Sequence, residues 1–127
     1  MQAHTWLYAA AAYNLGWGAF HLGFWRMFRW SEELPKLHPV NRGVMQVLNI
    51  MLTCVFLMLT VVLVLHAQEV TTSKLGRSLL AGMMGFWILR AILQLIFWPS
   101  QPRATNGAFA FLFMVGAGLH AMAYQPN

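Results

Sequence analysis

Residues 86–99 read FWILRAILQLIFWP, an apolar run with tryptophans near both ends and two strongly polar side chains, Arg90 and Gln94. The run continues an apolar stretch that starts near residue 77 and stops at a proline, a residue that ends helices. About 20 residues of helix cross a bilayer, and this stretch has that length. The sequence therefore predicts a membrane-spanning helix over residues 77–98.

The composition of the whole chain agrees with this prediction. Of its 127 residues, 59% are hydrophobic and only 9% are charged, whereas a soluble domain carries about 25% charged residues. Three more apolar stretches have a spanning length, at residues 5–28, 44–67 and 106–124. We predict an all-α integral membrane protein, a bundle of four transmembrane helices, with residues 1–127 as a single membrane domain.

Three polar segments separate the four predicted spans, and the first and third of them contain two prolines each. The first of them contains WSEEL, in which Ser31 precedes two acidic residues, Glu32 and Glu33. Because serine caps helices and acids favour the first turn, a short interfacial helix is expected over about 31–37. Trp30 is expected to lie at the inner membrane boundary beside it. The three separating segments are 31–43, 68–76 and 99–107.

Basic residues at the ends of the predicted spans set the expected direction of the chain. The first and third connections hold five of them, and the second holds two. Because Lys and Arg concentrate in cytoplasmic loops, both termini are expected on the outer side of a bacterial inner (cytoplasmic) membrane. The five are Arg26, Arg29, Lys36, Arg42 and Arg103, and the two are Lys74 and Arg77.

The formal net charge of +5 comes from eight Lys and Arg residues against three acids. These cations are spread between apolar stretches and form no cluster able to follow a phosphate backbone. We therefore expect the lipid bilayer as a partner and no nucleic acid.

Polar residues in three predicted spans fall on one face of each helix. Arg90 and Gln94 are about 40° apart at 100° per residue. At a rise of 1.5 Å per residue, both lie about 4–10 Å on the cytoplasmic side of the bilayer centre, as do His21 and Asn49. We predict that these four residues converge on one ligand site. Further residues expected to line it are Asn14, Trp25, Gln46 and Trp87.

The chemistry expected of this site follows from the missing counter-charge. No Asp or Glu lies within any predicted span, so Arg90 has no carboxylate partner there. A charged residue inside a membrane span usually faces the bundle interior and marks a functional site. We therefore predict that the protein binds or passes a small anionic or polar ligand. A structural role, in which Arg90 extends to the headgroups or clamps neighbouring helices, stays open.

Two other classes of function remain open. The first is a membrane enzyme or redox subunit, holding haem, quinone or a metal, with His21 as a general base. No catalytic residue and no cofactor is assigned, and a metal site is disfavoured because His4 and His66 are expected near span ends, where imidazole is common among the headgroups. The second is a structural partner in a larger membrane assembly. The candidate metal ligands are His4, His66 and His120.

A line of small residues follows one side of the first predicted span. Small side chains at such spacing allow two helix backbones to approach closely. The partner is either another span of the same chain or a second membrane protein, such as another copy in a homo-oligomer. The line consists of Ala12, Gly16, Ala19 and Gly23.

The length and the four-span plan resemble those of fluoride channels, small multidrug exporters and membrane-bound glutathione transferases. The residues that define these families are missing. The first span has no membrane glutamate, and HPVNRGVMQVLN at 38–49 lacks the transferase arrangement of arginines with an acid. A resemblance of architecture implies no function.

Overall fold

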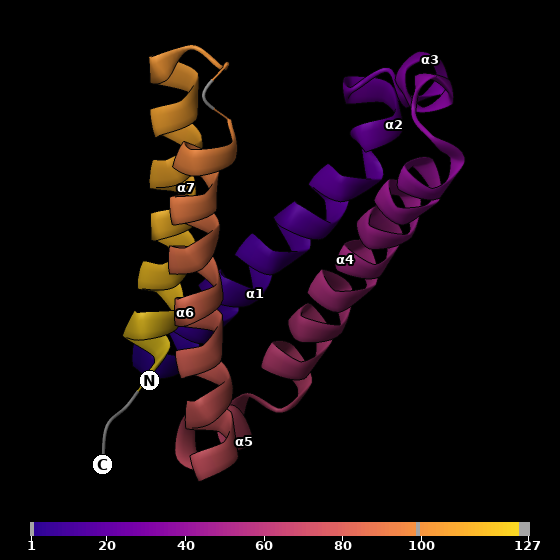
Figure 1. Ribbon diagram of the computed structural model, residues 1–127. Helices are drawn as coiled ribbons and strands as arrows, with labels where there is room; N and C mark the ends of the chain where they lie inside the picture. The colour runs from indigo at the N-terminus through magenta and orange to yellow at the C-terminus, as the bar shows by residue number, and fades with distance from the viewer. Residues whose placement is uncertain (1, 99, 125–127) are drawn as a thin grey trace. The chain divides into compact units, whose positions relative to one another are not determined.

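The computed structural model describes residues 2–98 and 100–124, which form helices and short connections with no strand (Figure 1). The all-α prediction is confirmed for these residues. In chain order, the elements are α1 (Gln2–Leu22), α2 (Phe24–Met27), α3 (Trp30–Glu33), the 3-10 helix η1 (Leu34–Lys36), α4 (Pro39–Leu65), α5 (Ala67–Thr72), α6 (Lys74–Phe97) and α7 (Arg103–Ala123).

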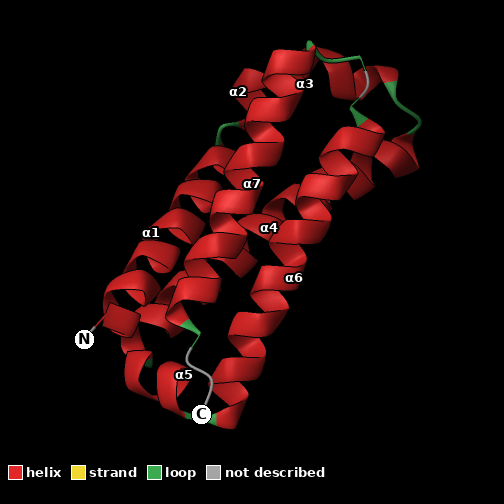
Figure 2. Ribbon diagram, turned by 90° about the vertical axis from the view of Figure 1, so that its left-hand side faces the viewer, coloured by secondary structure: helices red, strands yellow, loops and turns green. Residues whose placement is uncertain are grey.

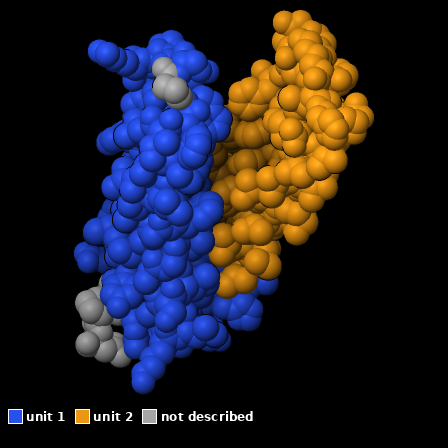
Figure 3. Space-filling model, in the orientation of Figure 1, with its two compact units in different colours: residues 1–10, 63–127 blue, residues 11–62 orange. Residues whose placement is uncertain are grey.

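The chain divides into two compact units, which Figure 3 shows in different colours. Unit 1 consists of residues 1–10 and 63–127, and unit 2 of residues 11–62. The division falls within α1 and within α4, so both helices run from one unit into the other. The single membrane domain expected from the sequence stays a prediction.

Three helices, α4, α6 and α7, are long and apolar enough to cross a membrane. Large apolar side chains are exposed along them, among them Leu65, Phe97 and Phe111. Such exposure is unfavourable in water and ordinary against lipid. The helix α1 has 21 residues but is not among these three, because polar and aromatic residues lower its hydropathy. Three of the four predicted spans are thus both long enough and apolar enough to cross a membrane.

The connection between α1 and α4 differs from the expected one. The helix α1 ends at Leu22 and not at residue 28, because a turn at Gly23 separates it from α2. Hydropathy does not reveal this break, since the apolar composition continues into α2. Arg29, with a positive φ of 50°, precedes α3, and Ser31 lies inside that helix. The predicted Ser31 cap is therefore wrong.

Unit 1 is built around a hairpin of two antiparallel helices. The helices α6 and α7 run side by side in both ribbon views (Figures 1 and 2). The short helix α5 begins at Ala67 and continues into the segment 68–76, which was expected only to separate two spans, and it packs against α6. Ser73 accepts a hydrogen bond from the Gly76 amide at 2.9 Å and so caps α6.

Unit 2 pairs residues 11–22 of α1 with α4 in an antiparallel arrangement. At one end, the Thr60 hydroxyl donates to the Ala11 carbonyl at 3.3 Å. Gly18 lies between the ends, where a Cβ atom would be 3.5 Å from the Leu57 side chain. The absence of a larger side chain at Gly18 allows the two helices to approach closely.

Candidate functional site

The Arg90 guanidinium of α6 lies over two aromatic rings. Its Cζ atom is 4.2 Å from the centre of the Phe113 ring, which α7 contributes. The same atom is 5.1 Å from the ring of Trp98, just after the end of α6. Both distances are within the range of cation–π attraction, about 6 Å. The aromatic rings therefore hold the cation in place within unit 1.

The guanidinium nevertheless has a donor that these rings do not satisfy. Nη1 of Arg90 is buried and has no hydrogen-bond partner among residues 2–98 and 100–124. Neither α6 nor α7 contains an Asp or Glu residue. A buried donor without an acceptor is unfavourable, and more so on a charged group. The arrangement suits an acceptor supplied from outside the chain.

Gln94 follows Arg90 by one helical turn and joins the two helices of the hairpin. Its side chain is only 4% exposed, and its Nε2 donates to Oδ1 of Asn106 at 2.9 Å. This hydrogen bond fixes the α6–α7 register next to Arg90. An interhelical amide pair of this kind stabilises a membrane protein by about 1 kcal/mol or less.

Trp87 packs against Phe113, one of the two rings that contact Arg90. Its ring stacks on Phe113 with an interplanar angle of 14° and 5.9 Å between ring centres. Both side chains are almost fully buried. Phe113 therefore contacts Trp87 as well as the Arg90 cation, and Trp87 acts on the site through Phe113.

A second polar pair joins α1 and α4 in unit 2. His21 Nδ1 lies 2.9 Å from Asn49 Oδ1, and Asn49 Nδ2 donates to the His21 carbonyl at 3.0 Å. Because Oδ1 only accepts, Nδ1 donates the proton of this hydrogen bond. The His21 ring also stacks on Phe24, with 4.5 Å between ring centres.

The structure thus brings the predicted site residues together in two sets. Arg90, Gln94 and Trp87 belong to unit 1, whereas His21 and Asn49 belong to unit 2. Convergence of the two sets on one ligand stays a prediction. The other predicted lining residues lie in unit 2, with Asn14 buried, Gln46 half-buried and Trp25 exposed.

The three candidate metal ligands have separate surroundings in unit 1. Nε2 of His4 is 3.2 Å from the Thr71 hydroxyl, and Nδ1 of the buried His120 donates to the Gly116 carbonyl at 2.7 Å. His66 is exposed and precedes α5. Across the described ranges, no three His, Cys, Asp or Glu side chains form a group that could hold a metal.

The line of small residues on α1 is open along part of its length. Ala12 and Ala19 are exposed, and nothing lies within 4 Å of a Cβ atom built on Gly16. Gly23 meets only nearby atoms of its own turn, from Met27 and Phe20. The close approach within unit 2 occurs instead at Gly18, on the face that also carries His21.

The sequence-based site lacked three residues. Phe113 and Trp98 contact the Arg90 guanidinium, and Asn106 accepts the hydrogen bond from Gln94. Asn106 carried a usable signal, because a polar residue near the start of one span pairs well with Gln94 near the end of the preceding one. The aromatic contacts carried none, since phenylalanine and tryptophan occur throughout these helices.

A double-mutant cycle measures the contact between Arg90 and Phe113. Arg90→Gln and Phe113→Leu are each expected to destabilise the protein, and their effects to be non-additive by about 1 kcal/mol. The readout is the free energy of unfolding in detergent. Phe111→Leu, at an exposed position of the same helix, is the matched control and is expected to show no coupling. Additive effects of the Arg90 and Phe113 substitutions would exclude the cation–π contact.

Comparison of the chain with protein-family models, with curated proteins and with solved structures gives no match.

Proposed function

We propose that this chain is a small polytopic membrane protein that binds or passes a small anionic or polar ligand at Arg90. The observation that supports this most is the buried Nη1 donor of Arg90, which has no acceptor among the described residues. A cation inside an apolar helix is unfavourable enough that such positions commonly serve a function.

The chemistry of the surrounding side chains favours an anion. The guanidinium donors lie in its plane, and ring contacts through Cζ leave those donors available to acceptors in that plane. A carboxylate or phosphate provides two acceptors with matching geometry, and a halide provides one. Gln94 holds the adjacent α7 helix in register, while Phe113 and Trp98 contact the guanidinium through its Cζ atom.

The proposed topology extends the three apolar helices by a fourth span, α1. Its aromatic residues and its hydrogen bonds to α4 support a place within the bundle. The excess of basic residues in the first and third connections favours termini on the outer side of a bacterial inner membrane. The exposed small residues of α1 favour self-association or a membrane-protein partner.

Thermal unfolding in detergent tests the proposed ligand class. The purified protein is heated with sodium salts of chloride, phosphate, sulfate and acetate at constant ionic strength. At least one anion is expected to raise the Tm, because binding at about 100 times Kd stabilises the folded state by about 2.7 kcal/mol. Arg90→Gln is expected to remove this response.

Two further variants separate a binding site from a general salt effect. Arg103→Gln removes an exposed cation at the start of α7 and is expected to keep the full anion response. Arg90→Lys keeps the charge but loses the planar donors, so a reduced response is expected. An anion response that is equal in the wild type and in both Arg90 variants would refute the proposal and leave Arg90 a structural role.

A further inference from the structure

Residues 23–42, called here the cap segment, form one end of unit 2. They include α2, α3, η1 and the first residues of α4 (Figure 1). A helix that crosses a bilayer ends at the headgroup layer, and α4 begins at Pro39 with the length and apolarity of a membrane span. The cap segment therefore belongs at the level of the lipid headgroups.

The cap segment buries some apolar side chains and turns others outward. Trp30 is 6% exposed and Leu34 is 2% exposed, so these two form the inside of the segment. Neighbouring residues cover the Trp30 ring, and its expected place at the inner membrane boundary stays a prediction. Trp25, Met27 and Phe28 are instead 47%, 50% and 48% exposed. Exposed aromatic side chains beside a span are typical of the membrane–water interface.

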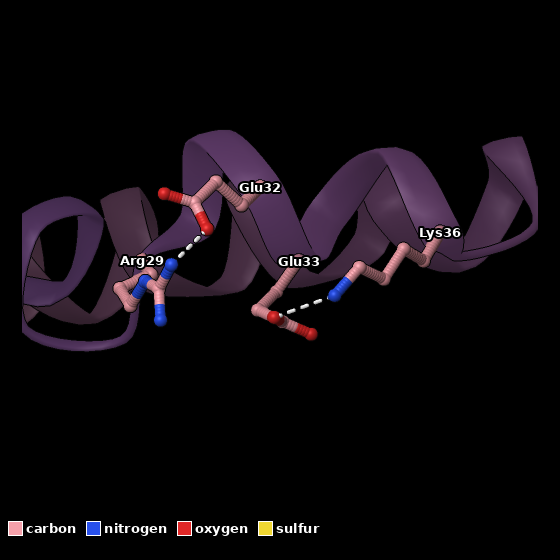
Figure 4. Close-up of polar contacts among 4 residues, drawn as sticks. All are labelled: Arg29, Glu32, Glu33 and Lys36. Carbon is pink, nitrogen blue, oxygen red and sulfur yellow. Dashed lines mark hydrogen bonds and ion pairs between the residues drawn. The ribbon is translucent and has the colours of Figure 1, made fainter.

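The charges of the cap segment are unevenly compensated. Its two acids are each paired with a nearby cation, Arg29 with Glu32 and Lys36 with Glu33 (Figure 4). The Lys36 ammonium donates to Glu33 and lowers the pKa of that carboxyl below its ordinary value. The carboxylate thus stays ionised at neutral pH, and both pairs are neutral overall.

Two cations of the cap segment remain for an outside partner. Arg26 and Arg42 form no ion pair within residues 2–98 and 100–124. Arg26 lies between Trp25 and Met27 in α2, and Arg42 lies in the first turn of α4. A surface with net positive charge and exposed aromatic side chains complements an anionic lipid headgroup.

We propose that the cap segment binds anionic phospholipids. Arg26 and Arg42 contact the phosphate groups, while Trp25, Met27 and Phe28 enter the boundary between headgroups and acyl chains. The inference requires that α4 spans the bilayer, and it is independent of a ligand at Arg90. It assigns an interaction surface to residues that the proposed ligand site does not use.

Lipid retention by the full chain tests this proposal. The protein is placed in nanodiscs that contain phosphatidylcholine and phosphatidylglycerol, and native mass spectrometry counts the lipids that remain bound after release. The wild type is expected to prefer phosphatidylglycerol. The double variant Arg26→Gln with Arg42→Gln is expected to lose about fivefold in this preference for each arginine removed.

Three controls make the result specific to Arg26 and Arg42. Arg29→Gln with Glu32→Gln leaves the net charge unchanged, and Arg26→Lys with Arg42→Lys keeps both cations, so both variants are expected to retain the lipid preference. Added salt is expected to weaken it in the wild type. Circular dichroism of each variant verifies its helical fold. Unchanged phosphatidylglycerol preference in the double Gln variant would overturn the proposal. An equal loss in the Arg29→Gln, Glu32→Gln variant would overturn it as well.

Discussion

Replacing Gly76 with alanine is expected to lower the free energy of unfolding by about 3 kcal/mol, an effect typical of severe overpacking. A Cβ atom at this position would be 2.2 Å from the carbonyl oxygen of Val70 and 2.4 Å from its Cα atom. These are backbone atoms of α5, so no side-chain rotation relieves the clash. The helix α5 must move away from α6, and the Ser73 cap of α6 is disturbed with it.

A second glycine of the same helix provides the matched control. Nothing lies within 4 Å of a Cβ atom built on Gly82, so Gly82→Ala is expected to stabilise the protein by about 0.5–1 kcal/mol. The measurement is reversible unfolding in detergent, followed by circular dichroism. Equal stability of the two alanine variants would show that α5 does not pack against the start of α6 in the folded protein.

Asn49→Ala is expected to cost about 2 kcal/mol, because one side chain makes two hydrogen bonds across the α1–α4 pair. Its amide donates to the His21 carbonyl, which lies in the last turn of α1. The last four carbonyls of a helix have no hydrogen-bond donor within that helix. Asn49 of α4 provides such a donor to the His21 carbonyl. The substitution also leaves the His21 ring without its acceptor.

The cost of Asn49→Ala can be assigned to this pair by two further measurements. Asn41→Ala, at an exposed position in the first turn of the same helix, is expected to change the free energy of unfolding by less than about 0.5 kcal/mol. A cycle with His21→Ala is expected to show a coupling of about 1 kcal/mol. A coupling of zero would mean that the two side chains do not interact in the folded protein.

The apolar helices of this protein were predictable from sequence, whereas their ends were less so. The length and the apolar composition of α4, α6 and α7 are properties of the sequence itself, which is why composition alone identified them. The helix α4 starts at Pro39, five residues before the predicted span, because proline is well suited to the first turn. The helix α5 was missed because its short sequence, AQEVTT, is mostly polar and resembles a loop.

The candidate site was predictable in its polar residues and not in their partners. The helical period placed Arg90 and Gln94 on one face, and the structure assigns both to the α6–α7 hairpin. The period says nothing about which of many aromatic residues contacts the guanidinium, because that depends on the rotation of α7. The predicted level shared by His21, Asn49, Arg90 and Gln94 relates residues of two units and stays a prediction.

The binding of an anion at Arg90 is tested most directly by native mass spectrometry of gently extracted protein. The wild type and Arg103→Gln are expected to carry the same small anionic adduct, and Arg90→Gln is expected to lack it. This expectation holds for any oligomeric state that the spectra report. Adducts of equal mass and occupancy in all three proteins, or none in the wild type after incubation with the anion that raises its Tm, would contradict the account.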